Sequence, residues 1–452
     1  MSERPIRLNA FDMACVGHQS MGLWRHPADQ GWRYKDLRYW LELARLLERG
    51  LFDGLFIADV LGVYDVYGSS PDAALRNAVQ VPVNDPILTI PAMAAATEHL
   101  GFGVTASISF EHPFPFARRM STLDHLTNGR IGWNVVTSYL ESGARNLGMV
   151  AQLTHDNRYD VADEYLDVCY KLWEGSWEDD AVVRDAERGV FTDPAKVHPI
   201  RHAGEHFTVP GIHLCEPSPQ RTPVIYQAGS SPRGRRFASE HAEAIFTGGP
   251  TASHVAGIVA DIRARMREAG REPHDARVYT IATVIVDETE AKARAKHDEL
   301  RRLTSDEAAL ATVSGFMGFD LSAYDLDDPV EDVESNAIQG VVAGFRAAEN
   351  DGRPWTVRDI ARWAGIGGMG PVIVGSPSQV ADELQRWVDE ADVDGFNLAY
   401  AITPGTFEDI VERRGVHRTR YEPGTLREKL LGEGPRLPER HRGARMRALV
   451  RQ

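Results

Sequence analysis

The chain has 452 residues, 43% hydrophobic and 25% charged, which is the composition of a globular protein with a sizeable core. Its formal net charge of −15 argues against general binding to nucleic acids or anionic membranes, because such binders usually present a basic surface. The sequence contains neither a signal-peptide pattern nor an apolar run of membrane-spanning length, and its three cysteines form no C-x-x-C pair. We therefore expect a cytoplasmic protein without a metal site.

Eight short apolar runs, most of them separated by helix-like stretches such as "LRYWLELARLLERG", are typical of buried β-strands. The runs lie at 6–13, 52–60, 101–110, 130–138, 222–231, 242–249, 278–286 and 393–405. Alternating strands and helices indicate a parallel sheet. Eight such units favour a closed (β/α)₈ barrel, the TIM barrel of the α/β class, over an open doubly wound sheet.

Two connections are too long for simple links and predict insertions after the fourth and seventh strands, at about 139–221 and 287–371. Long insertions in compact folds are commonly lids or binding loops. We expect residues 1–420 to form one barrel domain that carries both insertions. Residues 421–452 are rich in Arg, Gly and Pro. They are expected to form a tail that wraps over a surface or a partner subunit, or that is partly disordered.

Polar residues follow several of the predicted strands, and the carboxyl ends of barrel strands are where active sites form. They are Asp59, Thr105, Ser107, Asn134, Ser230 and Ser231. G-x-S-x-G, H-E-x-x-H and G-x-x-x-x-G-K-[ST] motifs are absent from the sequence, which argues against hydrolase and kinase functions. Asp59 could accept a hydrogen bond from a ligand N–H, or it could cap the next segment.

The stretch "QAGSSPRGRR", residues 227–236, combines two serines with a helix start at Pro232. Serine hydroxyls, free backbone N–H groups and a helix N-terminus together can bind an anion. Arg233, Arg235 and Arg236 would oppose the helix dipole in the first turns, so they need another reason to be there. A bound phosphate is one reason, and pairing with acids such as Glu240 is the other.

The stretch "THDNRYD", residues 154–160, places His155 and Tyr159 one helical turn apart. Both extend an apolar stripe that continues through Ala162, Tyr165 and Leu166 with helical spacing. This pattern alone favours core residues with satisfied partners, and residues that hold a ligand are the alternative.

The chain after the first strand carries Phe11, Met13, His18 and Trp24, a mixture that suits an apolar pocket with one proton-handling group. The alternative is that Phe11 and Trp24 belong to the core and that His18 is a solvated loop residue. Phe246, at the end of "AEAIF" in the sixth apolar run, is open to the same two interpretations, core or pocket.

With these stretches assembled, nearly the whole chain resembles the luciferase-like flavin monooxygenases. The resemblance is to the branch that oxygenates nitrilotriacetate, EDTA, dibenzothiophene sulfone and dimethyl sulfide. It rests on stretches that include "WRHP", "LERGLFDGLFIADV", "ARRMSTLDHLTNGRIGWNVVTS", "HDNRYDVADEY" and "SPQRTPVIYQAGSSPRGRRFA". It implies a TIM barrel that binds FMN at its carboxyl end. The FMN contacts that it implies are Asp59, Thr105, Asn134, His155, Tyr159, Ser230 and Ser231.

The resemblance further implies an oxygenase that uses reduced FMN and O₂, in which the cofactor supplies the difficult chemistry. The stretches "LNAFDMACVGHQS", "LWEGSWEDDAVVRD" and "VDGFNLAYAITPG" favour dimethyl sulfide as substrate, converted to methanethiol and formaldehyde. Phe11, Met13, Trp24 and Phe246 would line its pocket, and His18 would handle a proton. The expected partners are a separate NAD(P)H-dependent flavin reductase and further copies of the chain, in a dimer or tetramer.

Two other interpretations stay open. The first is a monooxygenase on the same frame that acts on another sulfone, an amine, an aromatic compound or a flavin. The second is a flavin-binding protein without enzymatic activity.

Overall fold

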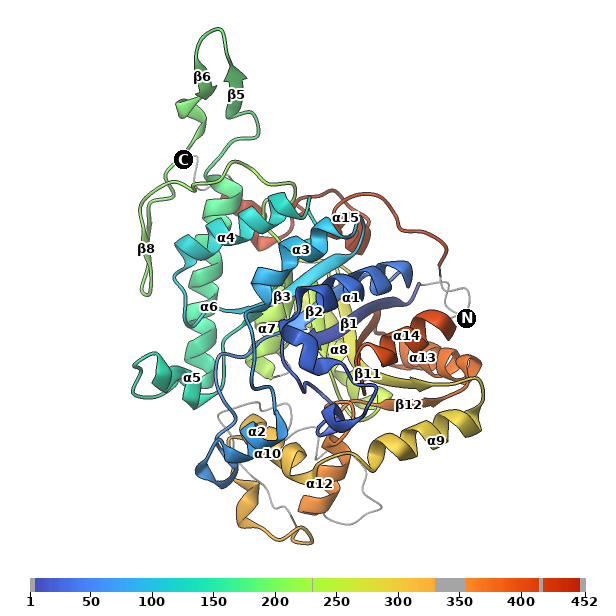
Figure 1. Ribbon diagram of the computed structural model, residues 1–452. Helices are drawn as coiled ribbons and strands as arrows, with labels where there is room; N and C mark the ends of the chain where they lie inside the picture. Colours follow the sequence, from blue (N-terminus) through green and yellow to red (C-terminus); the bar gives the residue numbers. More distant parts are fainter. Residues whose placement is uncertain (1–4, 230, 330–354, 414–417, 448–452) are drawn as a thin grey trace.

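The computed structural model describes residues 5–229, 231–329, 355–413 and 418–447. Its main sheet closes into a parallel barrel in the order β10-β9-β4-β3-β2-β1-β13-β11, with β10 paired to β11 (Figure 1). The barrel strands are β1 (Arg7–Met13), β2 (Gly54–Ala58), β3 (Gly101–Ser107), β4 (Ile131–Val136), β9 (Val224–Gln227), β10 (Ala244–Thr247), β11 (Arg277–Val286) and β13 (Gly395–Ala399). Each coincides with one of the eight predicted runs, so the predicted (β/α)₈ barrel is confirmed.

A further strand, β12 (Val372–Gly375), pairs with the far end of β11 and does not close the cylinder. This is possible because β11 is ten residues long. Its first half pairs with β10 and its middle with β13, which leaves Thr283–Val286 to pair with β12.

Helices surround the barrel and present their apolar faces to it. In α1 (Leu37–Arg49), Asp36 caps the N-terminus by accepting from the Arg38 N–H, and Trp40, Leu43 and Leu47 are buried. The other helices that cover the barrel or lie between its strands are α3 (Ile90–Ala95), α4 (Pro113–Leu126), α7 (Pro232–His241), α8 (Ala252–Glu268), α13 (Pro377–Ala391) and α14 (Gly405–Arg413).

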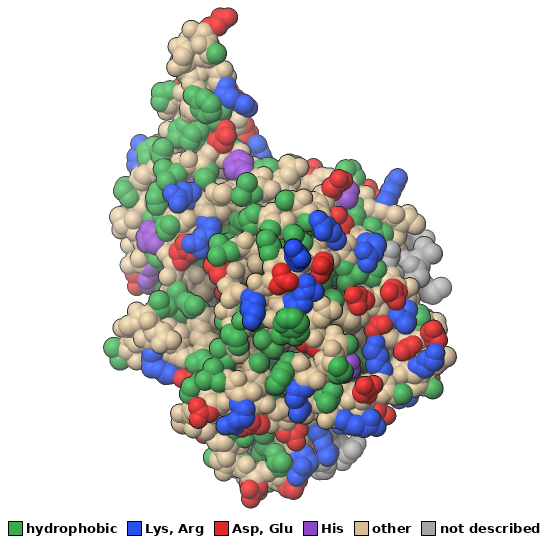
Figure 2. Space-filling view, viewed as in Figure 1, with side chains coloured by type: hydrophobic (Ala, Val, Ile, Leu, Met, Phe, Trp, Pro, Cys, Tyr) green, Lys and Arg blue, Asp and Glu red, His purple; other side chains and the backbone are tan. Residues whose placement is uncertain are grey.

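The segment between β4 and β9 contains α5 (Glu141–Asn146) and α6 (His155–Tyr170), followed by two small hairpins. Strands β5 (Val182–Asp185) and β6 (Val190–Thr192) form a hairpin that projects far from the barrel (Figure 1). Strands β7 (His202–Ala203) and β8 (Thr208–Val209) form the other hairpin. Figure 2 shows the projection as a narrow arm on a body whose visible face carries interspersed acidic and basic side chains.

The segment between β11 and β13 contains α9 (Glu290–Arg301), α10 (Asp306–Met317) and α12 (Val357–Ala364). With α2 (Asp72–Asn77), helices α10 and α12 enclose a second apolar core that includes Met21, Tyr64 and Leu140. This core lies beside the carboxyl ends of the barrel strands. The insertion therefore builds a wall of the site described below.

The chain after 420 packs closely on the barrel in its described part. In α15 (Leu426–Leu431), Leu426 and Leu430 join the apolar cluster inside the barrel. Arg427 is fully buried, and its Nε lies 2.5 Å from Glu243 Oε1. Farther on, Arg442 donates to both carboxylate oxygens of Asp167 on α6. Among the described helices, none is long and apolar enough to cross a membrane.

Candidate active site

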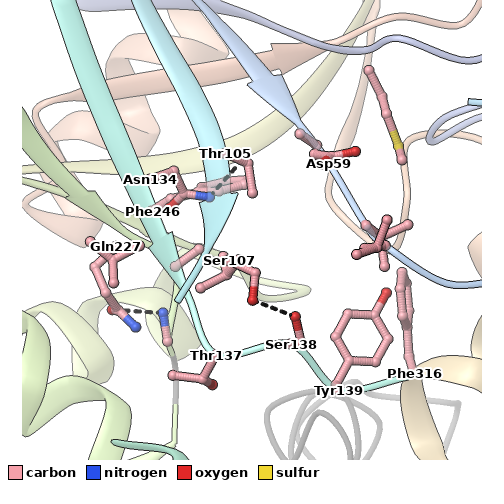
Figure 3. Close-up of a pocket in the computed structure, with 18 of the residues that line it drawn as sticks. Asp59, Thr105, Ser107, Asn134, Thr137, Ser138, Tyr139, Gln227, Phe246 and Phe316 are labelled. Carbon is pink, nitrogen blue, oxygen red and sulfur yellow. Dashed lines mark hydrogen bonds between the residues drawn. The ribbon is translucent and has the colours of Figure 1, made fainter. Parts of the chain in front are cut away.

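A cavity of about 290 Å³ opens at the carboxyl ends of the barrel strands (Figure 3). Most of the predicted site residues line it, although they come from six strand ends and from helix α6. They are Phe11, Met13, His18, Asp59, Thr105, Asn134, His155, Tyr159, Ser231 and Phe246. The alignment of strand ends in a parallel barrel explains why residues so distant in sequence meet here.

At one end of the cavity, the start of α6 lies against the start of α7. Ser231 caps α7 by accepting from the Gly234 N–H, and its Oγ is 3.1 Å from His155 Nε2. The Tyr159 hydroxyl accepts from Gln227 Nε2 at 3.3 Å. The two stretches that the sequence singled out, 154–160 and 227–236, therefore form one polar end of the cavity, and its backbone N–H groups and hydroxyls suit an anion.

The backbone at this polar end leaves no room for an additional side-chain carbon. A Cβ at Gly229 would lie 2.6 Å from the Tyr159 hydroxyl and 3.0 Å from the Gly234 Cα. Glycine is thus required because two backbone segments and a tyrosine hydroxyl converge on one point.

The three arginines of residues 227–236 form salt bridges with acidic side chains. This agrees with the interpretation that they pair with acids and do not bind a phosphate. Arg233 pairs with Asp160 and Asp163, Arg235 with Asp261, and Arg236 with Glu240. These side chains therefore give no support to a bound phosphate.

A cation that the sequence reading missed does line the cavity. Arg158 lies on α6 between His155 and Tyr159 and is only 3% exposed. Burial lowers the pKa of its guanidinium, which stays charged at neutral pH. The i, i+3, i+4 spacing of His155, Arg158 and Tyr159 was the available signal, because it places all three on one helix face.

In the middle of the cavity, polar side chains from neighbouring strands meet (Figure 3). Asn134 Nδ2 donates to Thr105 Oγ1 at 2.9 Å, while Asn134 Oδ1 is buried without a hydrogen-bond partner among the described residues. The hydroxyls of Ser107 and Ser138 lie 2.7 Å apart. An amide oxygen left over in a buried site is an acceptor for a ligand N–H, since buried polar groups are rarely unpaired.

Asp59 follows β2 at the edge of the cavity and is the sole acid among the described residues that line it. Burial, and then the nearby charge of Asp85, raises the pKa of this carboxyl to about 7. No helix begins directly after Asp59, since the next helical turn starts at Tyr67. Its geometry is therefore that of a cavity residue rather than a helix cap.

The part of the cavity that faces the barrel interior is aromatic, and it is called the aromatic end below. The ring centroid of Phe11 is 5.5 Å from that of Phe56 and 5.1 Å from that of Phe246. The ring of His18 packs against Phe11 at 4.5 Å. Phe316, which comes from α10 in the second insertion, also lines the cavity.

His18 is buried rather than solvated, contrary to the loop-residue alternative. Burial lowers its pKa to about 3, so the imidazole is neutral at physiological pH. The Gln19 amide lies 3.0 Å from Nε2, whereas Nδ1 has no hydrogen-bond partner among the described residues. A protonated imidazolium that could donate a full proton is not available here at neutral pH.

One predicted site residue of the described chain lies away from the cavity. Trp24 does not line it: the side chain is 41% exposed, and its indole N–H donates to the Asn77 carbonyl on α2 at 3.1 Å. Gly22, with φ of 89°, turns the chain just before Leu23 and Trp24. Ser230 lies outside the described residues.

The residues of the cavity fit a flavin mononucleotide. The polar end suits a phosphate, because it combines Arg158, His155 and the start of α7. The unpartnered Asn134 oxygen suits a ring or ribityl donor, and the aromatic end leaves apolar space beyond it.

Comparisons with known proteins agree with this geometry. Residues 12–394 match the family described as Luciferase-like monooxygenase. The chain is 54% identical to the dimethyl-sulfide monooxygenase of Hyphomicrobium sulfonivorans, over 95% of this chain and 91% of that protein. It is 51% identical to the long-chain alkane monooxygenase of Geobacillus thermodenitrificans, over 98% of both. A solved riboflavin lyase, RcaE, with modified FMN and riboflavin superposes with a TM-score of 0.92 at 38% identity, covering 98% of this chain and 100% of that one.

Proposed function

Since the chain belongs to the luciferase-like monooxygenase family, we propose that it is a reduced-FMN-dependent oxygenase of a two-component system. Members of this family are flavin-dependent oxidoreductases that use O₂. Its proposed substrate is dimethyl sulfide, converted to methanethiol and formaldehyde. The observation that carries the proposal is a single cavity with a cationic, hydroxyl-rich end and an aromatic end.

The polar end would hold the FMN phosphate through Arg158, His155 and Ser231, with Tyr159 packed between them. Thr105 and Asn134 would face the flavin ring, as would Asp59 at the edge of the cavity. Bound in reduced form, the flavin would supply the electrons that activate O₂. The chain itself binds, orients and keeps water out.

The walls of the cavity support a small and neutral substrate. Among the described lining residues, Arg158 is the sole Arg or Lys, and it lies at the proposed phosphate end. An anionic substrate such as an aminopolycarboxylate would therefore meet no cation at the aromatic end. Phe11, Met13, Phe56 and Phe246 would instead pack on methyl groups.

The neutral His18 would act as a positioning residue rather than as an acid. With the Gln19 amide donating to Nε2, the ring carries its proton on Nδ1 and can donate one hydrogen bond into the site. Replacing His18 by Asn should then raise the fraction of O₂ released as hydrogen peroxide, which is read as peroxide formed per NADH consumed. Unchanged coupling would show that His18 is only part of the wall.

The likeness to the alkane monooxygenase is almost as high as that to the dimethyl-sulfide monooxygenase, so a long-chain alkane is the second candidate substrate. The decisive experiment supplies FMN, NADH and a purified flavin reductase. It then compares dimethyl sulfide, hexadecane, dibenzothiophene sulfone and nitrilotriacetate, with products identified by mass spectrometry. Methanethiol and formaldehyde in equal amounts are expected. Hexadecanol as the main product would show that a long-chain alkane, and not dimethyl sulfide, is the substrate. Flavin binding without product from any compound would favour a flavin-binding protein without enzymatic activity.

A separate reductase is proposed because the sequence has no G-x-G-x-x-G stretch after a strand for a nicotinamide cofactor. NADH with FMN and the chain alone should give no product, and adding the reductase should restore it. Association into a dimer or tetramer is also proposed. The β5–β6 arm exposes Phe191 at 63% and Val183 at 45%, and a second copy would cover them. Light scattering of the purified chain tests this.

A further inference from the structure

A second cavity, of about 220 Å³, lies at the opposite, amino-terminal end of the barrel. Its wall is formed by the starts of β1 and β2, by inward-facing tyrosines of β9 and β11, and by α15 with the chain before it. Apolar side chains of Ile6, Leu426 and Leu430 make up part of the wall, so the cavity is not merely a polar cleft.

The charged residues of this cavity are mostly cations, although the whole chain carries a net charge of −15. Arg7, Arg418, Arg420 and Lys429 line it, against the acids Asp53 and Glu422. Asp53 is shared, because its Oδ1 pairs with Arg7 at 3.3 Å and with Arg418 at 3.0 Å.

Lys429 is compensated only in part, by a carbonyl and by the Tyr421 ring, whose centroid lies 5.8 Å from Nζ. Its Nζ donates to the His99 carbonyl at 3.0 Å, and no salt bridge to it is found within the described parts of the chain. Burial, and then the charges of Arg130 and Arg418, lowers the pKa of this amine to about 8, against the opposing effect of Glu48 and Asp53. An anion beside Lys429 would supply the missing counter-charge.

A buried hydroxyl in the same wall also lacks a partner. Tyr279 is 1% exposed, and its hydroxyl has no hydrogen-bond partner among the described residues. A buried donor without a partner costs free energy, and such exceptions call for an explanation. A ligand oxygen in the cavity would accept from it.

We propose that this cavity is a second binding site for a small organic anion, held by Lys429 and the Tyr279 hydroxyl, with its apolar body against Leu426 and Leu430. The shared chemistry is one oxyanion group on a short apolar body, either a carboxylate or a phosphate ester. The site is separate from the flavin cavity, because Phe56 and its aromatic neighbours fill the barrel interior between the two ends.

The test measures how fast single lysines of the full chain are acetylated by an N-hydroxysuccinimide ester at pH 8, by peptide mass spectrometry. Butyrate and inorganic phosphate are the two probes, and sodium chloride at equal ionic strength is the control. We expect a probe to slow acetylation of Lys429 at least threefold without slowing that of exposed Lys292 on α9. Protection by butyrate identifies a carboxylate, and protection by phosphate alone identifies a phosphate group. Equal slowing at both lysines, or none, would overturn the proposal.

A conservative variant separates binding from folding. Tyr279→Phe keeps the buried ring and removes the unpartnered hydroxyl, so the protein should fold normally. The probe concentration that gives half protection of Lys429 should rise about fivefold. Tyr170→Phe, which removes a buried hydroxyl that contacts His241 on the outer face of the barrel, is the matched control and should leave that concentration unchanged. Equal behaviour of the two variants would exclude the Tyr279 hydroxyl from the site.

Discussion

Arg158→Met tests whether the polar end of the carboxyl-end cavity holds a phosphate. Methionine keeps most of the aliphatic volume of arginine and removes its charge and donors. Arg158 is 3% exposed, so solvent screens its interaction with a bound anion only weakly. A hydrogen bond to a charged group contributes about 1.5–3 kcal/mol, which corresponds to a roughly 10- to 150-fold loss of FMN affinity.

Riboflavin makes this prediction specific, because it lacks the phosphate and shares the ring and ribityl chain. Titration of both flavins, followed by fluorescence or calorimetry, should show a large loss for FMN and less than about a twofold change for riboflavin. Arg294→Met, on the exposed face of α9, is the matched control and should change neither affinity. If Arg158→Met weakened the two flavins equally, Arg158 would not contact the phosphate and the proposed orientation of FMN would be wrong.

Three further substitutions test the site and the fold. Asp59→Asn should remove a pH-dependent step near pH 7 from FMN binding. Burial raises the pKa of Asp59 from 3.8 to about 7, so between these pH values the folded state holds a proton that the unfolded state has released. The free energy of unfolding therefore falls as the pH rises from about 4 to about 7. In urea unfolding, the variant should show a smaller fall over this pH range. Gly229→Ala should lower stability by about 1–3 kcal/mol and FMN affinity more than tenfold in titrations, because its Cβ would clash with Tyr159. Arg427→Met leaves buried Glu243 unpaired and should lower the free energy of unfolding by about 3–5 kcal/mol, whereas a smaller effect would mean that water reaches the pair.

The barrel could be predicted from the sequence because its strands are buried on both faces. Such strands read as continuous apolar runs, and the eight runs coincide with the eight barrel strands. Strand β12 was not counted among the eight, and its role depends on pairing with the overlong β11. Such long-range pairing is not encoded in the local pattern of either segment.

The limits of local pattern also explain the errors at the site. A bound phosphate was one explanation for Arg233, Arg235 and Arg236. The sequence could not exclude it, because the acids that pair with Arg233 and Arg235 are distant in sequence. Asp163 and Asp261 reach them only after α6 and α8 have packed beside α7. Arg158 was passed over for the converse reason, since a charged residue in a polar stretch is usually solvated.

Trp24 shows a different limit, because proximity in sequence to His18 was taken as proximity in space. The left-handed turn at Gly22 separates the two, burying Leu23 and directing the Trp24 indole to Asn77. By contrast, His155 and Ser231 are 76 residues apart and in contact, and the family resemblance had placed both at one FMN site.

The division of the cavity between barrel and insertions bears on substrate choice. The residues that would hold the flavin come mainly from strand ends and from α6. The outer wall is different: Tyr139 begins the first insertion, Phe316 comes from the second, and their rings lie 6.0 Å apart. The two relatives that are 54% and 51% identical to this chain carry different substrate names, so a shared fold does not determine the substrate. Tyr139 and Phe316 therefore join the barrel residues Phe11 and Phe246 as side chains whose substitution we expect to change the products, and comparison of products is more informative than further comparison of the barrel.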